Sequence, residues 1–269
     1  MYRRGVYRFL LSRQWVILTL VALAVIPVMV ELGFWQFHRH EQRVARNQLI
    51  EENLRAPAVP VQRLAAPDRE VPGSQVWRPV RATGRYDTQH EVVVRQRTGS
   101  DDRSIGYYVL TPLELTDGRV VLVNRGWIPA GGDLTAFPEV PAAPTGEVTV
   151  TGRLKADETS GGSGIKDRRG LPDRQVMLIN SGQQAERLGR QVLGGYIELT
   201  GTAPAPGDGQ PETVAEPDHD GVGVHLAYAV QWWLFAAGVP IGWVVLVRRE
   251  RRDRLAAVRT EGTRPAVAA

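Results

Sequence analysis

The sequence contains no cysteine and only three methionines among its 269 residues. Without cysteine the chain forms no disulfide and offers no thiolate for redox chemistry or metal binding. The scarcity of methionine likewise argues against a soft copper site. A domain outside the cytoplasm must therefore be stabilised by ordinary burial of apolar side chains, which a chain of this length can supply.

Signatures of hydrolytic enzymes are also lacking. The sequence has no Gly-x-Ser-x-Gly or His-Glu-x-x-His motif. The glycine-rich stretch Gly161–Gly164 is not followed by Lys-Ser or Lys-Thr and is therefore no phosphate-binding loop. Asp101 and Asp102 are predicted to be a solvated charge pair on a loop. The sequence therefore predicts a protein that is not an enzyme.

Long apolar runs are confined to the two ends of the chain. Trp15–Leu32, in which Glu31 is the one charged residue, and Leu226–Val247 each have about the length that an α-helix needs to cross a bilayer. A cleaved signal peptide is the alternative for Met1–Val30, but the run is long and no clear cleavage site follows it. Trp15 and Trp35, twenty residues apart, match the spacing of the two interfacial aromatic belts. We therefore expect two retained transmembrane helices.

Arginine is abundant, with 31 Arg against 2 Lys, and its distribution predicts the orientation of the chain. Residues 1–30 and 248–269 together carry 11 basic and 3 acidic residues, whereas residues 31–247 carry 22 basic and 26 acidic residues. Basic residues beside membrane spans stay in the cytoplasm, so both termini are expected there. This distribution accounts for the net charge of +4 without nucleic-acid binding.

These observations predict five consecutive parts of the chain. They are a cytoplasmic N-terminus (1–14), a first transmembrane helix (15–35), an extracytoplasmic β-rich domain (36–222), a second transmembrane helix (223–247) and a basic cytoplasmic tail (248–269). The first helix is expected to continue out of the membrane over Phe37–Leu54, and Ala56–Pro72 is expected to be a connector.

The central region is typical of a mainly antiparallel β domain, either a curved sheet or a small barrel. Thr116-Asp117-Gly118 predicts a tight hairpin turn. One short helix is expected over Ser181–Leu188, with Ser181 as its N-cap. Runs rich in Val, Ile, Tyr and Trp predict seven strands: Val76–Tyr86, Glu91–Gln96, Tyr107–Leu115, Val120–Ile128, Val148–Leu154, Gln175–Asn180 and Tyr196–Thr200.

His225 is the most informative of the five histidines, because it lies at the entrance to the second apolar run. Gln231 follows one and a half turns later, and polar groups at this depth often mark a function or the interior of a bundle. A histidine at membrane depth suits axial ligation of haem iron. The residues alone favour an interfacial histidine facing headgroup water. His38 and His40 are predicted to be solvated, although they lie where they could approach His225.

Two further histidines and one arginine complete the set of candidates. His90, in a predicted turn, and His219, in a proline-rich linker, are expected to be surface residues. Arg125 lies within an otherwise apolar strand, where it needs a carboxylate, backbone carbonyls or an anionic ligand. A structural arginine that holds the end of a strand is the favoured interpretation.

Five segments in order resemble the surfeit locus protein 1 family, the assembly factors of haem-a-containing cytochrome c oxidase. The matching segments are Leu32–Gln36 with Arg39, Gly84–Asp87, Gly106–Leu113, Leu122–Pro129 and His225–Trp232. The resemblance implies two transmembrane helices around an extracytoplasmic domain, which agrees with the hydropathy pattern. The basic C-terminal tail departs from the family pattern.

The resemblance also implies a function. It predicts a membrane protein without enzymatic activity that transiently binds haem a and aids its insertion into oxidase subunit I, together with the haem a synthesis machinery. His225 would then be the iron ligand, which reverses the interpretation from the residues alone. Gln231 belongs to the same segment, and Arg39 and Arg125 are expected to neutralise haem propionates. The alternative is a scaffold that stabilises oxidase subunits without binding haem.

The arginine-rich composition suggests a bacterium of high GC content and hence the plasma membrane.

Overall fold

The computed structural model describes residues 7–168, 170–217 and 223–261. The chain divides into two compact units. A helical unit combines the residues up to 47 with those from 220 onward, and a β unit comprises residues 48–219. This division confirms the expected fold class, two terminal apolar helices flanking a β domain. His219 and the last eight residues of the predicted tail lie outside the described residues.

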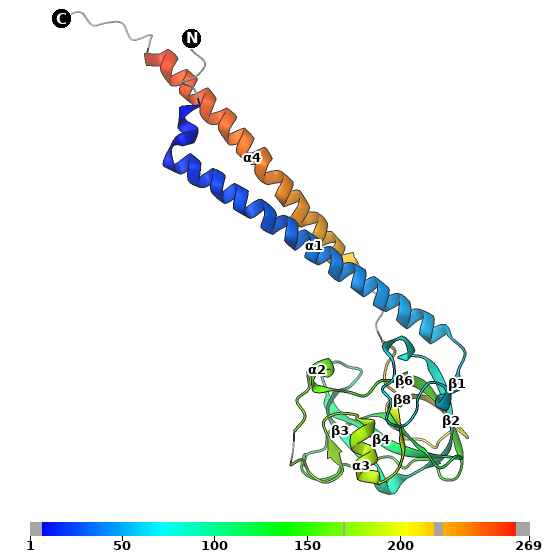
Figure 1. Ribbon diagram of the computed structural model, residues 1–269. Helices are drawn as coiled ribbons and strands as arrows, with labels where there is room; N and C mark the ends of the chain where they lie inside the picture. Colours follow the sequence, from blue (N-terminus) through cyan, green and yellow to red (C-terminus); the bar gives the residue numbers. More distant parts are fainter. Residues whose placement is uncertain (1–6, 169, 218–222, 262–269) are drawn as a thin grey trace, which may run out of the picture. The chain divides into compact units, whose positions relative to one another are not determined.

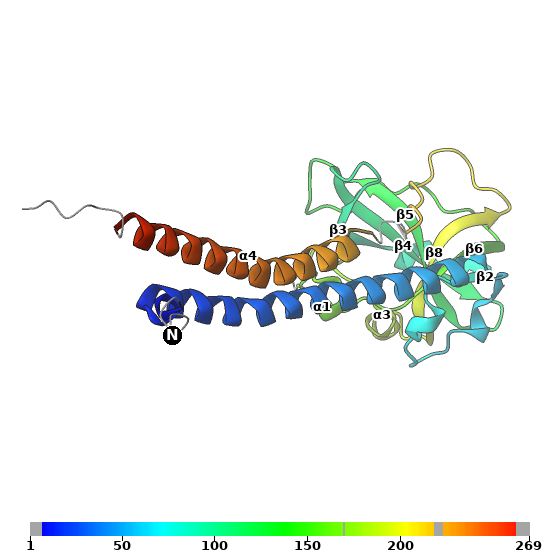
Figure 2. The same cartoon turned by 90° about the horizontal axis from the view of Figure 1, so that it is seen from above.

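The helical unit is formed by α1 (Arg13–Arg55), α4 (Gly223–Glu261) and a short 3-10 turn, η1 (Arg8–Leu11). The two long helices lie side by side (Figures 1 and 2). Both are long and apolar enough to cross a membrane, and only 6% of the most apolar stretch of each is buried. Side chains this apolar and this exposed are those of helices that face lipid rather than a protein core. The continuation of the first helix over Phe37–Leu54 is confirmed.

Small residues allow α1 and α4 to approach each other closely. Gly33 lies against the indole of Trp233, and a Cβ at this glycine would overlap the indole ring. The ring of Phe34 meets the same indole edge-to-face at 5.7 Å. Nearer the chain termini, Trp243 donates a hydrogen bond from Nε1 to the Thr19 hydroxyl at 3.1 Å. Close packing and interhelical hydrogen bonds are the interactions that hold helices together in lipid.

The described residues of the β unit form eight strands, five of which close into a small barrel. The strands are β1 (Val59–Pro60), β2 (Pro79–Tyr86), β3 (Val92–Thr98), β4 (Ile105–Leu115), β5 (Val120–Pro129), β6 (Val148–Lys155), β7 (Gln175–Val176) and β8 (Val192–Ala203). The barrel follows the order β2-β6-β8-β5-β4 and closes because β4 also pairs with β2. Its pairings are antiparallel except for β5–β8. The domain is therefore mainly antiparallel, as predicted.

The long apolar run at the start of β5 is explained by burial on both faces of the strand. Val121 and Val123 point into the barrel core, together with Leu113, Leu154 and Ile197. The alternate residues Val120 and Leu122 belong to a second cluster, which packs against the short helix α3 (Ser181–Leu188). All four side chains of the run are at most 1% exposed.

Two predictions for the region before and at α3 were wrong. The strand expected over Gln175–Asn180 is limited to Gln175–Val176, because side chains then replace strand partners: Met177 accepts a hydrogen bond from Arg97, and Ile179 donates one to Glu158. The N-cap is Asn180, whose side-chain oxygen accepts the amide of Gln183 at 3.0 Å. Ser181 instead donates its hydroxyl to Asp157.

The strands β1, β2 and β8 also differ from the prediction, and β2 begins at Pro79 rather than Val76. β1 lies within the segment Ala56–Pro72, which was expected to be a connector, and pairs in parallel with the start of β2. β8 begins at Val192 rather than Tyr196, because Gly194-Gly195 is a bulge and not a turn. Gly195 has φ of +75°, and a Cβ there would overlap the carbonyl oxygen of Lys155. Only glycine combines this conformation with so close a backbone.

Gly84 is where β2 passes from one barrel neighbour to the other. It pairs with Val148 of β6 and with Leu115 of β4, and a Cβ there would overlap the Glu114 carbonyl oxygen. We therefore expect Gly84→Ala to lower the free energy of unfolding by about 2–3 kcal/mol, the usual cost of overpacking. Thermal unfolding followed by circular dichroism measures the change. Gly201→Ala on β8, where a Cβ meets no atom within 4 Å, is the matched control and is expected to change stability little. Equal stability of the two variants would contradict the role of Gly84 in barrel closure.

Candidate functional site

His225 lies in the first turn of α4 and makes a specific contact with α1. Its Nδ1 lies 2.9 Å from Oε1 of Gln36. An amide oxygen only accepts hydrogen bonds, so Nδ1 carries the proton and donates it to Gln36. The proton on Nδ1 leaves a free lone pair on Nε2, the nitrogen available to bind a metal. Gln36 was not among the residues singled out from the sequence, although it ends the segment Leu32–Gln36.

The face of α4 that carries His225 also carries the residues packed against α1. Ala229 and Ala236 are buried, and Trp233 contacts Gly33 and Phe34. These positions follow His225 at helical spacings of four, eight and eleven residues, which places them on one face. Gln231 lies off this face and is exposed. Its assignment as a haem contact stays a prediction.

His38, His40 and His90 do not join His225 in a metal cluster. Among the described residues, no three His, Asp or Glu side chains are grouped so that they could hold a metal ion. His38 is exposed and His40 half-buried, both on α1. His90 lies on the surface in a short turn and is 2.8 Å from Asp87. Arg39 is exposed on α1, with its guanidinium 6.0 Å from the centre of the Trp35 ring.

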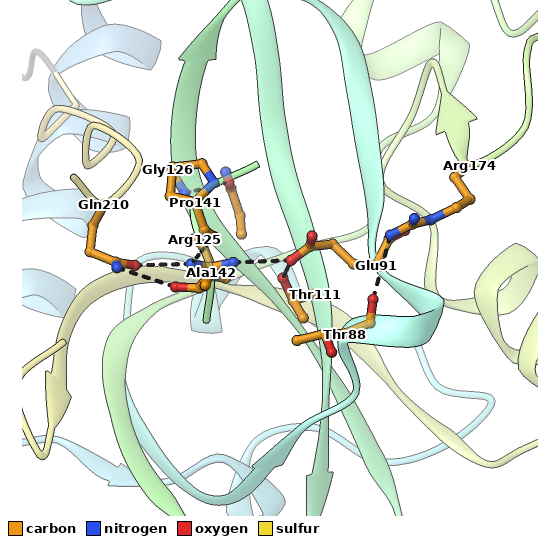
Figure 3. Close-up of polar contacts among 10 residues, drawn as sticks. Thr88, Glu91, Thr111, Arg125, Gly126, Pro141, Ala142, Arg174 and Gln210 are labelled. Carbon is orange, nitrogen blue, oxygen red and sulfur yellow. Dashed lines mark hydrogen bonds and ion pairs between the residues drawn. The ribbon is translucent and has the colours of Figure 1, made fainter. Parts of the chain in front are cut away.

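Arg125 is the most buried charged side chain of the candidates, and protein groups surround it. Nη1 donates to Glu91 at 3.0 Å, and Nη2 donates to the Pro141 carbonyl at 2.8 Å and to the Gln210 side chain at 2.9 Å (Figure 3). Thr111 donates a further hydrogen bond to the same oxygen of Glu91. The side chains of Arg125 and Glu91 are 2% and 8% exposed.

This arrangement agrees with the structural interpretation of Arg125. Its charge is balanced by Glu91, and its hydrogen bonds tie two loops, through Pro141 and Gln210, to strand β5. Burial raises the pKa of the neighbouring Tyr86 phenol to about 12, while Arg125 limits the rise, so the phenol is neutral at physiological pH. A role of Arg125 toward a haem propionate stays a prediction; it lies in the β unit, whereas His225 lies in the helical unit.

Two more buried arginine–glutamate pairs repeat this pattern around the barrel. Arg153 binds Glu198 at 3.1 Å and donates to the carbonyls of Val214 and Ala215. Arg97 binds Glu158 and the Met177 carbonyl. Burial raises the pKa of Glu198, while Lys155 and Arg153 counteract the rise. Arg125 on β5 and Arg153 on β6 thus fasten loops to the barrel, and Arg97 fastens the segment around Met177 to β3 beside it, which are structural tasks.

Comparison with known proteins identifies the family. The SURF1 family matches residues 23–237, which include the whole barrel and parts of both apolar helices. This chain belongs to the SURF1 family. The family is one of oxidase assembly factors rather than enzymes, as the segments in the sequence predicted.

The relatives span bacteria and a eukaryote. An uncharacterized SURF1-like protein of Mycobacterium tuberculosis is 34% identical over 250 residues, which cover 91% of this chain and 88% of that protein. A SURF1-like protein of Rickettsia felis is 28% identical over 108 residues, 40% of this chain and 45% of the relative. A SURF1-like protein of Dictyostelium discoideum is 29% identical over 103 residues, 36% of this chain and 37% of the relative.

The contact between Gln36 and His225 predicts a measurable role for the glutamine. Partners of a metal-ligating histidine fix its ring orientation and tautomer, and their loss typically lowers metal affinity 10- to 100-fold. For the haem ligation by His225 that the family resemblance implies, we expect Gln36→Ala to weaken haem binding to the purified protein by about this factor, as measured by spectroscopic titration. Gln36→Glu, which keeps a hydrogen-bond acceptor, is expected to retain most of the affinity. Equal affinity of Gln36→Ala and wild type would show that the contact does not orient His225.

Proposed function

We propose that this protein holds haem a through His225 while cytochrome c oxidase is assembled, and passes it to subunit I. In this proposal haem a is cargo rather than a resident cofactor, and it is received from the haem a synthesis machinery. The protein resides in the plasma membrane, with both termini in the cytoplasm and the β unit on the extracytoplasmic side.

The observation that carries the proposal is the hydrogen bond from His225 to Gln36. This hydrogen bond stabilises the tautomer with the proton on Nδ1 and leaves the lone pair of Nε2 pointing away from Gln36, which is the state of an axial histidine ligand. Because Gln36 is on α1 and His225 on α4, pairing of the two helices sets the orientation of the imidazole ring.

The donor set suits haem better than a bare metal ion. A metal held by protein groups alone needs about four ligands, whereas no group of even three occurs among the residues that the structure describes. The porphyrin of haem supplies four nitrogen ligands to the iron, so the protein needs to supply only one or two axial ligands. A single oriented histidine at the end of an apolar helix therefore fits this cargo.

The orientation of the protein rests on the arginines that flank the helices. Arg8 and Arg13 precede the first apolar run, and Arg248, Arg249 and Arg251 follow the second. Such residues favour the cytoplasmic side by the positive-inside rule. His225 then lies at the extracytoplasmic end of α4, on the same side of the membrane as the β unit.

The loops of the β unit favour a second function, a scaffold that binds oxidase subunits. Segments 136–144 and 204–217 contain little regular structure, yet buried Arg125 and Arg153 fix parts of both to the barrel. Loops positioned in this way on a rigid domain commonly carry binding surfaces. Protein contacts of this kind are compatible with haem delivery and also with a scaffold that never binds haem.

A gene deletion tests the assembly function. The deletion strain is expected to contain less haem-a-containing oxidase, measured as haem a absorbance of its membranes and as cytochrome c oxidation, and the wild-type gene is expected to restore both. Full oxidase activity in the deletion strain would refute the assembly function. Restoration by a variant that does not bind haem would instead support the scaffold.

A further inference from the structure

Five arginines between positions 248 and 254 lie at the cytoplasmic end of α4, and the structure separates them into two sets. Arg249 lies 4.0 Å from Asp253, and Arg254 lies 2.7 Å from Glu250, each pair within one turn. Arg248, Arg251 and Arg252 have no acidic partner among the described residues of the helical unit. The two paired arginines are therefore locally compensated, and the other three carry the uncompensated positive charge.

The three uncompensated arginines line one hollow. Its walls are Arg248, Arg251, Arg252, Val245 and Leu255, and its volume is about 620 Å³. The spacings of three, six, seven and ten residues from Val245 place all five side chains on one side of α4. Arg251 is further held by the ring of Tyr7, 5.5 Å from its guanidinium carbon. The paired residues Arg249 and Asp253 lie outside this hollow.

The position of the hollow along the helix matches the boundary of a bilayer. Val245 lies in the last turn of the apolar run, and the arginines begin at Arg248, where the run ends. Arginine binds phosphate oxygens through its planar, permanently charged guanidinium. Basic pockets at the cytoplasmic end of transmembrane helices are suited to anionic headgroups.

We propose that this hollow binds an anionic phospholipid of the cytoplasmic leaflet. The three arginines bind the phosphate of the headgroup, and the apolar surface that continues from Val245 along α4 contacts the acyl chains. The site is distinct from the His225 site, at the opposite end of the α4 apolar run, and does not depend on haem binding. A lipid bound here would fix the depth and tilt of α4 in the membrane.

The test is retention of lipid by the purified, full-length protein. Native mass spectrometry after delipidation and titration with phosphatidylglycerol or phosphatidylcholine counts the bound lipids. Wild type is expected to retain one phosphatidylglycerol in preference to phosphatidylcholine. Electrostatic attraction near a membrane surface amounts to roughly a fivefold change in affinity per arginine. Arg248→Gln/Arg251→Gln is therefore expected to bind phosphatidylglycerol about 25-fold more weakly.

Arg249→Gln/Arg254→Gln is the matched control, since it removes the same charge from the same helix and leaves the hollow intact. It is expected to keep the wild-type preference, and far-ultraviolet circular dichroism confirms that both variants remain helical. If both double variants lost the same affinity for phosphatidylglycerol, the net charge of the tail would explain the binding, and the proposal would be overturned. Equal retention of both lipids by wild type, or displacement of the lipid by glycerol phosphate alone, would also overturn it.

Discussion

Replacement of His225 by alanine is expected to abolish the contribution of this protein to oxidase assembly. The variant keeps both apolar helices and the barrel but loses the side chain that Gln36 orients. Because this imidazole is the iron ligand in the proposed function, its loss is expected to lower haem a affinity more than 100-fold. In a deletion strain complemented with His225→Ala, haem-a oxidase activity is expected to fall to the level of the strain without the gene.

His38→Ala provides the control for this experiment. It removes an exposed histidine of α1 that makes no hydrogen bond or ring contact with His225 among the described residues. We expect it to complement the deletion fully, with membrane levels of both variants compared by immunoblot. Full complementation by His225→Ala at a wild-type membrane level would rule out His225 as the functional ligand. Gln231→Ala in the same assay tests the prediction that Gln231 contacts haem.

Replacement of Arg125 by methionine is expected to have the largest effect on stability. It leaves the carboxylate of Glu91 buried without its counter-charge and frees Pro141 and Gln210 from the barrel. Breaking a buried ion pair by removing one partner typically costs 3–5 kcal/mol. We therefore expect the β unit of Arg125→Met to unfold at a markedly lower temperature, measured by circular dichroism of the β signal in the full chain.

The double variant Arg125→Met/Glu91→Gln distinguishes the contribution of the ion pair to stability from the contribution of the packing of the Arg125 side chain. It removes both charges, so no carboxylate remains buried alone, and we expect it to regain a large part of the lost stability. Destabilisation equal to the sum of the two single variants would show that Arg125 and Glu91 do not interact. Wild-type stability of Arg125→Met would contradict the structural role assigned to Arg125.

Much of the fold could be predicted because apolar patterns report burial directly. The two membrane helices, the hairpin at Asp117-Gly118 and six of the seven predicted strands follow from runs of apolar, β-branched and turn-forming residues. One error, the short strand β7, occurred where side chains replace the backbone as hydrogen-bond partners, and another, the start of β8, occurred at the Gly194-Gly195 bulge. Glu158 and Arg97, distant in sequence, take over the hydrogen bonds after Val176, and no local pattern reveals them.

The candidate site was predictable only in part, for the same reason. His225 was conspicuous as a polar residue at the start of an apolar run. Gln36 lies 189 positions away and becomes its partner only because α1 and α4 pair. Strand pairing likewise brings Glu91 to Arg125, and the loop after β8 brings Gln210 to it. A sequence shows that a buried arginine needs partners, but the partners follow from the tertiary structure.

The absorption spectrum of the purified protein tests the central claim most directly. The protein is expressed together with the haem a synthesis enzymes, purified in detergent, and compared with His225→Ala prepared in the same way. We predict that wild type carries haem a, that His225→Ala carries less than about a tenth as much, and that added imidazole restores binding to the variant by replacing the missing ligand. Equal haem a in the two proteins, or none in wild type, would contradict the claim.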